Sequence, residues 1–202
     1  MKYFYDDTKL LDKYSAELGG VMTISDLRIL LGERDNTQLY RRIKALCNKK
    51  LLTCFVRGLY VTPEFNSERL VNRLYPDSSI SLTTVLAQSL VVNTVPASAV
   101  YATRSGPAHV FAGPGMSVNV LHIKPEMDFG TYVKGGIRYA TPEKALLDVF
   151  YYYQFGERYP FNFRTDLNLN KINLKAFNSY LLNYRNPKFV SFVRKVIDEY
   201  PK

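Results

Sequence analysis

Tryptophan is absent from the 202-residue sequence, and cysteine occurs only twice, as Cys47 and Cys54. So few cysteines fit a reducing compartment, where free thiols act as small hydrophobic side chains. No apolar run approaches the roughly 18 residues that span a bilayer, and the N-terminus lacks the apolar core and cleavage site of a signal peptide. We therefore expect a soluble, cytoplasmic protein that makes no membrane contact.

Residue patterns typical of enzymes are also missing. The only two histidines, His109 and His122, have no cysteine near them in the sequence, and the two cysteines lack the spacing of zinc ligands. No Gly-x-Ser-x-Gly elbow occurs, and the glycine-rich segment 112–116 lacks the Gly-Lys-Ser/Thr ending of a phosphate-binding loop. We predict no catalytic site, no metal and no cofactor.

Glu143 and Asp148 are two carboxylates of one predicted helix. Their separation of five residues places them on different helix faces. The helix dipole is the better explanation of Glu143, and Asp148 is expected to be a surface or helix-pairing residue. The two give no support for acid–base catalysis.

Positive charge is what the sequence has in excess. The formal net charge is +9 and the pI is about 9.4, which indicates an anionic partner such as nucleic acid. Residues 33–60 contain seven basic and two acidic side chains, whereas residues 65–202 spread sixteen basic and ten acidic side chains over a far longer segment. The basic excess is therefore concentrated near the N-terminus.

The N-terminal segment predicts three helices. The first spans about residues 6–18 and is stopped by a glycine pair. Thr23 can cap a second helix, with Asp26 in the place of a capping box, and Gly32 ends it. The third begins at residue 35 or 36 and extends to about residue 50. Two short helices joined by a tight turn suit a helix-turn-helix.

One face of the third helix is cationic. At about 100° per residue, the buried face holds Leu39, Ile43, Leu46 and Cys47. The opposite face combines cations with side chains that hydrogen-bond base edges, since arginine suits guanine and glutamine or asparagine suits adenine. The small Ala45 would let this face lie close to a groove floor. The predicted DNA-contacting residues here are Thr37, Gln38, Arg41, Arg42, Lys44, Asn48 and Lys49.

A β-hairpin is predicted directly after this helix. Residues 51–56 and 59–62 are β-prone, and Arg57 and Gly58 form a two-residue turn between them. This order is typical of the wing of a winged helix-turn-helix, which would place Arg57 at a phosphate or in the minor groove. The alternative is a packing unit whose basic face is merely solvated, because such folds also serve as protein-interaction modules.

The remainder of the chain predicts a second domain beyond a boundary at residues 64 and 65. A serine-capped apolar helix is expected at 82–90, and short strands from about residue 97 to 139 imply a small, mainly antiparallel sheet. A helix starting at Thr141 and Pro142 follows, and two further helices are broken near Asn186. The predicted fold class is α+β, with a winged helix-turn-helix in residues 1–64 and an α+β domain with C-terminal helices in residues 65–202.

The stretch from Phe150 to Phe163 is rich in aromatic side chains, with Arg158 and Arg164 nearby. Nucleic-acid bases can stack on such rings. A chain without tryptophan needs other large apolar groups, so we expect this stretch to continue the core under the sheet. A partner surface is the alternative.

Three segments resemble the AbiEi family, the antitoxins of type IV toxin–antitoxin systems that also act as transcriptional regulators. They are the hairpin end GLYV at 58–61, the segment ISLTTVL at 80–86 and the segment ATPEKALLD at 140–148. The resemblance runs from about Thr23 to Tyr153. Its most specific element is the Pro-Glu-Lys-Ala-Leu-Leu-Asp helix.

The resemblance implies a winged helix that binds double-stranded DNA at inverted repeats in its own promoter and represses the operon. It also implies a C-terminal domain that counters a nucleotidyltransferase-like toxin without a stable complex. The family's DNA-contacting region carries over to Thr37, Gln38, Arg41, Arg42, Lys44 and Arg57, and no catalytic residue carries over.

We therefore expect a DNA-binding repressor that is a monomer or weak dimer and is not an enzyme. Two alternatives stay open. One is a protein-interaction module whose basic face neutralises an acidic toxin by direct contact. The other is an enzyme acting on nucleic acid, although the sequence lacks paired carboxylates with the spacing of metal ligands.

Overall fold

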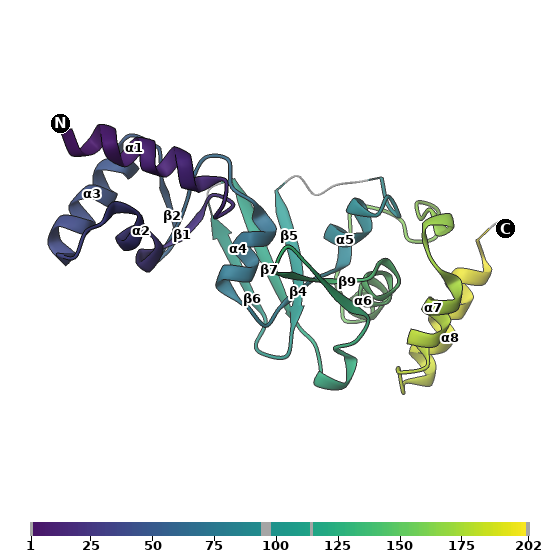
Figure 1. Ribbon diagram of the computed structural model, residues 1–202. Helices are drawn as coiled ribbons and strands as arrows, with labels where there is room; N and C mark the ends of the chain where they lie inside the picture. The colour runs from purple at the N-terminus through teal and green to yellow at the C-terminus, as the bar shows by residue number, and fades with distance from the viewer. Residues whose placement is uncertain (1, 94–97, 114, 201–202) are drawn as a thin grey trace. The chain divides into compact units, whose positions relative to one another are not determined.

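The computed structural model describes residues 2–93, 98–113 and 115–200. The chain forms two compact units, Met1–Leu74 and Tyr75–Lys202. Each unit combines helices with a sheet, so the α+β class is confirmed (Figure 1). Over the described ranges, no helix is both long and apolar enough to cross a membrane.

The first unit packs helices against a small antiparallel sheet (purple to blue in Figure 1). β1 and β2 both pair with the central strand β3. Leu11, Leu27 and Leu39, from the three helices α1 to α3, belong to one buried cluster. The elements are α1 (Lys2–Ser15), β1 (Val21–Thr23), α2 (Ile24–Leu31), α3 (Asn36–Asn48), β2 (Thr53–Val56), β3 (Leu59–Val61) and α4 (Ser67–Leu74).

Local sequence signals explain the helix ends in this unit. Thr23 and Asp26 form the predicted capping box: the Thr23 hydroxyl accepts from the Asp26 amide at 3.1 Å, and the Asp26 carboxylate accepts from the Thr23 amide at 2.9 Å. Gly32 ends α2 with φ of 62°, in the left-handed region that glycine adopts without a Cβ clash. Asp35 caps α3 by accepting from the Gln38 amide at 2.8 Å. The capping box and the end of α2 at Gly32 are confirmed, and α3 starts where the sequence placed it, at residue 35 or 36.

Two expectations for this unit are corrected. α1 begins at Lys2 and ends at Ser15 instead of spanning residues 6–18, because the chain turns before the glycine pair: the Gly20 amide donates to the Ser15 carbonyl at 2.7 Å. β1 is not predicted by the sequence, since three residues are too few to show an alternating pattern. It pairs with β3 and extends the predicted hairpin to a three-stranded sheet.

The boundary between the units follows Leu74 instead of residue 64. The polar stretch 64–69 at the expected boundary runs into the helix α4, in which Leu70 is fully buried. Arg73 of α4 forms an ion pair with Asp26 of α2 at 3.6 Å. A short helix with one apolar face has a mostly polar sequence, which is why the stretch leading into α4 resembles a boundary.

The second unit is built on a six-stranded sheet in the order β6-β7-β5-β4-β9-β8. The pairs β5–β7 and β4–β9 are parallel, and the other three neighbouring pairs are antiparallel. Antiparallel pairs are in the majority, as expected, but the sheet is mixed because of two parallel pairs that the sequence did not indicate. The reason is that β6 forms a hairpin with β7 on the outer edge, so β7 runs in the direction of β5.

In this unit most strands precede the helices along the chain, since β4 to β9 with the inserted α5 are followed by α6, α7 and α8. The expected break near Asn186 is confirmed, since this residue caps α8 by accepting from the Lys188 amide at 3.0 Å. The elements are β4 (Ser79–Ile80), α5 (Leu82–Gln88), β5 (Ala99–Arg104), β6 (His109–Gly113), β7 (Met116–His122), the 3-10 turn η1 (Pro125–Met127), β8 (Thr131–Lys134), β9 (Ile137–Ala140), α6 (Pro142–Gln154), the 3-10 turn η2 (Leu169–Lys171), α7 (Leu174–Leu181) and α8 (Pro187–Asp198).

α6 is the central helix of the second unit and contacts α5, α7 and α8. Its start is as predicted, with the Thr141 hydroxyl accepting from the Lys144 amide at 3.3 Å and Pro142 in the first turn. The aromatic stretch that begins on α6 supplies core side chains, since Phe150 and Phe163 are buried. Phe155 is an exception, because 71% of its surface is exposed.

Asp148 of α6 is not a surface residue, because its exposed fraction is 0%. It forms an ion pair with the buried Lys144 of the same helix and accepts from the Ser81 hydroxyl at 2.7 Å. Because Ser81 stands at the start of α5, this bond links α6 to α5, which is the helix-pairing role expected for Asp148. Ser81 stands before α5 but makes no side-chain capping bond there, so the expected serine cap is corrected. Glu143, besides its place in the first turn of α6, accepts from the Asn173 amide at 2.8 Å.

Candidate nucleic-acid interface

α3 exposes one polar face along its whole length. Leu39, Ile43 and Leu46 are at most 2% exposed, because apolar side chains at intervals of three and four share the face toward the core. The opposite face is fully open to solvent. Its exposed residues are Thr37, Gln38, Arg41, Lys44, Ala45 and Asn48, and Lys49 is exposed just past the helix end.

The cations of this face are unneutralised. No ion pair within residues 2–93, 98–113 and 115–200 involves Arg41, Lys44 or Lys49. The carboxylate of Asp35 lies at the start of the helix, where it accepts from the Gln38 amide. Positive side chains whose charge is not balanced nearby attract phosphate groups. The face can therefore receive an anionic partner without first breaking internal bonds.

Arg42 is the one predicted contact residue of α3 that the structure does not bring to this face. Its guanidinium forms an ion pair with Asp7 of α1 and another with Glu33 at 3.4 Å, and it donates to the Leu31 carbonyl at 3.0 Å. The hydrogen bond to Asp7 raises the pKa of Arg42 above its usual value. Arg42 is thus a structural link between α1, the end of α2 and α3, which corrects its assignment as a DNA contact.

A second arginine fixes the turn between α2 and α3. The Arg28 guanidinium donates to the Asn36 side-chain oxygen at 2.5 Å and to the Arg34 carbonyl at 2.9 Å. Asn36 is the first residue of α3. The two helices are therefore held at their junction by side-chain bonds as well as by the packed core.

The hairpin places Arg57 at an exposed two-residue turn. Val56 and Leu59 are opposite each other in the β2–β3 ladder, and Gly58 between them has φ of 86°. A positive φ in such a turn favours glycine. The Gly58 carbonyl accepts from the Ile24 amide at 3.1 Å, which ties the turn to the start of α2. Arg57 is thus displayed on a fixed loop.

Tyr40 and Lys50 are exposed near this face but are not among the DNA-contacting residues predicted from the sequence. Half of the Tyr40 surface is exposed, and Lys50 follows the helix with φ of 58°. The Lys50 amide donates to the Cys47 carbonyl at 2.9 Å, so the helix ends here. The helical wheel could have placed Tyr40 at the edge of the exposed face, whereas the left-handed turn at Lys50 carries no sequence signal such as glycine.

The two cysteines are free thiols with different surroundings. Cys47 packs against the buried cluster of the first unit, and burial raises the pKa of its thiol. Cys54 is exposed, so only Cys47 acts as a small hydrophobic side chain. Over the described ranges, no group of three or more His, Cys, Asp or Glu side chains could hold a metal ion.

The chain matches no protein family, and no curated protein matches it. Among solved structures, it is similar to the RV2827C protein from Mycobacterium tuberculosis, with a TM-score of 0.66 and 12% sequence identity. The match covers 98% of this chain and 77% of the mycobacterial one. At this identity the similarity concerns the fold, including the succession of both units.

Proposed function

We propose that residues 21–61 form a winged helix-turn-helix and that the chain binds double-stranded DNA through it. In this proposal α3 enters the major groove and the β2–β3 turn contacts the backbone. The observation that carries it is the open, acid-free face of α3, which lies on the same unit as the exposed Arg57. The ion pair of Arg42 with Asp7 and the hydrogen bond of Arg28 with Asn36 fix the position of α3. The exposed face is therefore preorganised.

The side chains of this face suit separate tasks. Arg41 can bind guanine with two hydrogen bonds, and Gln38 or Asn48 can bind adenine in the same way. Lys44 and Arg57 are suited to phosphates, which position the protein without reading the sequence. Ala45, at the centre of the face, leaves room for the groove floor.

The biological role that we propose is repression of its own operon as the antitoxin of a type IV toxin–antitoxin system. The support for this part is the resemblance of residues 140–148 to the AbiEi family. The expected target is a repeat in the promoter, and the expected functional partner is a nucleotidyltransferase-like toxin that forms no stable complex with the chain.

A mobility-shift titration of the full chain tests DNA binding. The duplexes are the chain's own promoter and a scrambled duplex of equal length and composition. We expect tighter binding to the promoter than to the scrambled duplex. The logarithm of the binding constant should fall linearly with the logarithm of the salt concentration, with a slope of about −0.9 for each phosphate contacted. Equal affinity for both duplexes would contradict sequence-specific recognition, and binding that is independent of salt would contradict the use of this face.

A further inference from the structure

The second unit contains a pocket of about 730 Å³ with aromatic walls. The ring of Tyr151 contacts Phe155 at 4.9 Å and Phe189 at 5.9 Å between centroids. Tyr184 packs on Phe189 at 4.6 Å. The walls come from the end of α6, from the α7–α8 loop with the first turn of α8, and from η1 with the residue before it, so three separate segments of the chain line the space.

Two large apolar side chains at this pocket are left uncovered. Phe155 is 71% exposed and Leu182 is 78% exposed, and both line the pocket. Exposed apolar surface costs roughly 25 cal/mol per Å² compared with buried surface. A cluster of such side chains beside a concave site is typical of surfaces that bind a partner.

Positive charge surrounds the same pocket. Lys124 and Arg185 line it together with a single acidic residue, Glu126. Residues 75–168 carry seven basic and seven acidic side chains, whereas residues 169–202 carry seven basic and only two acidic ones. The charge excess of the second unit is therefore in the segment that includes α7, α8 and the loop between them.

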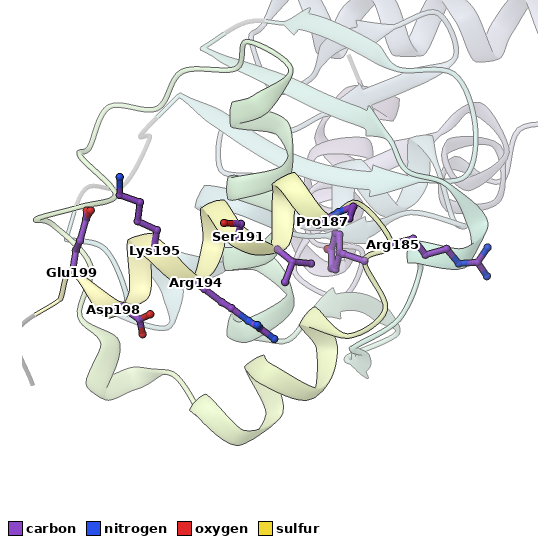
Figure 2. A pocket seen from close by; sticks show the side chains of 9 residues that line it. Arg185, Pro187, Ser191, Arg194, Lys195, Asp198 and Glu199 are labelled. Atoms are coloured by element: carbon purple, nitrogen blue, oxygen red, sulfur yellow. The ribbon is translucent and has the colours of Figure 1, made fainter.

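In the part of the chain that the structure describes, the two acids at the end of α8 form no ion pair with Arg185. Figure 2 shows the adjoining pocket along α8, where the Arg185 side chain extends beyond the start of the helix while Asp198 and Glu199 lie at its far end. Glu199 forms an ion pair with Arg164 at 2.7 Å. Arg185 is thus available to a carboxylate from outside the chain.

One residue that lines the pocket has a buried hydroxyl without a partner among the described residues. Tyr184 is 7% exposed, and its hydroxyl has no hydrogen-bond partner among the described residues. Burial raises the pKa of this phenol well above its usual value, so the hydroxyl keeps its proton and can donate. A buried donor without an acceptor costs free energy.

We propose that this pocket binds an acidic segment of a partner protein. One large apolar side chain of the segment inserts against Phe155 and Leu182, and flanking carboxylates face Lys124 and Arg185. A small anionic ligand fits these observations less well, because it would leave the rim side chains exposed. The proposal concerns the second unit alone and does not depend on DNA binding by α3.

The probe for this proposal is a short synthetic peptide in which one phenylalanine is flanked on both sides by glutamates. The full chain, labelled with nitrogen-15, is titrated and followed by NMR. We expect shifts confined to the amides around Phe155, Leu182 and Tyr184. Replacing the peptide's phenylalanine by alanine, or its glutamates by lysines, should weaken binding at least tenfold.

Matched variants locate the binding site. Leu182→Ser and Arg185→Glu should each weaken peptide binding at least tenfold. Leu174→Ser, which alters an exposed leucine of α7 outside the pocket, and Arg194→Glu, which reverses an exposed cation of α8, should change it less than twofold. The NMR spectra of all four variants report whether each is folded.

Three results would overturn the proposal. The first is peptide binding that both control variants weaken as much as the pocket variants. The second is tight binding of a mononucleotide to this pocket without binding of the peptide, which would make it a small-ligand site. The third is a dimer of the chain that Leu182→Ser dissociates, which would assign the surface to a second copy. DNA binding by the same variants, measured separately, distinguishes failure of this proposal from failure of the proposed function.

Discussion

Arg42 and Asp7 are 35 residues apart in the sequence, and they form an ion pair that joins α3 to α1. The Asp7 side chain is 3% exposed and that of Arg42 is 17% exposed, so water screens the pair weakly. Arg42 is a cation on the helix expected to contact DNA, but its ion pair holds that helix in place. This contact leads to the first prediction.

Asp7→Ala is expected to destabilise the first unit by roughly 2–3 kcal/mol, because it leaves the largely buried guanidinium of Arg42 without its main partner. Urea unfolding of the full chain, followed by tyrosine fluorescence, measures the loss. Asp6→Ala, which removes the exposed neighbour, is the control and should cost less than about 0.5 kcal/mol. Equal stability of the two variants would show that the ion pair contributes nothing.

Arg41→Ala and Arg57→Ala are expected to weaken DNA binding in different ways. Arg41→Ala should lower the preference for the promoter over scrambled DNA by about 1–3 kcal/mol, because it removes a base contact. Arg57→Ala should weaken binding to both duplexes alike and reduce the salt slope by about one. Mobility shifts at several salt concentrations separate the two effects, and Lys13→Ala on α1 serves as the charge control. A loss of preference in the Arg57 variant alone would reverse the two assignments.

Ala45→Glu is expected to abolish specific DNA binding while leaving the protein folded. The exposed position tolerates glutamate in a helix, but the new carboxylate would face the phosphates and block the close approach of α3. Circular dichroism checks folding, and Ala16→Glu makes the same substitution at another exposed alanine of the first unit. Promoter affinity that is unchanged in the Ala45 variant would remove α3 from the interface.

Asp148→Ala is expected to destabilise the second unit by roughly 3–5 kcal/mol, because Lys144 is then a buried charge without a counter-charge. The double variant Lys144→Met with Asp148→Leu should be more stable than Asp148→Ala, since apolar groups of similar volume replace the pair. Thermal unfolding compares the unchanged chain with the two variants. A double variant that unfolds at a lower temperature than Asp148→Ala would mean that the ion pair itself stabilises the unit.

Two tyrosine variants are expected to differ in stability. The Tyr152 hydroxyl donates to the His122 carbonyl, so Tyr152→Phe should cost about 1 kcal/mol. The buried Tyr184 hydroxyl has no partner among the described residues, so Tyr184→Phe should be neutral or slightly stabilising. Urea midpoints of the two variants provide the comparison. Equal losses would indicate that Tyr184 has an acceptor.

Local signals in the sequence predict much of the first unit. Thr23, Asp26 and Gly32 determine the ends of α2 through bonds to their own neighbours, and the Arg57-Gly58 turn determines the hairpin. The exposed face of α3 follows from apolar spacing alone. The sequence could not show that Arg42 faces inward, because its position depends on Asp7 in another helix.

Features that depend on distant contacts escaped sequence reasoning in the second unit as well. The mixed sheet depends on how β7 pairs with β5, which no local pattern encodes. Asp148 has the sequence spacing of a surface residue, yet its partner Ser81 lies 67 positions away. The pocket beside Phe155 and Leu182 combines three elements, and its aromatic side chains are individually indistinguishable from core residues in the sequence.

β4 is a strand of only two residues at the middle of the six-stranded sheet. Ile80 pairs with Ala102 of β5 on one side and with Tyr139 of β9 on the other, so this short strand joins a three-stranded ribbon to a two-stranded one. Neither the ribbon of β5, β6 and β7 nor the ribbon of β8 and β9 completes the sheet without β4. The continuity of the sheet therefore depends on the backbone pairing of Ser79 and Ile80.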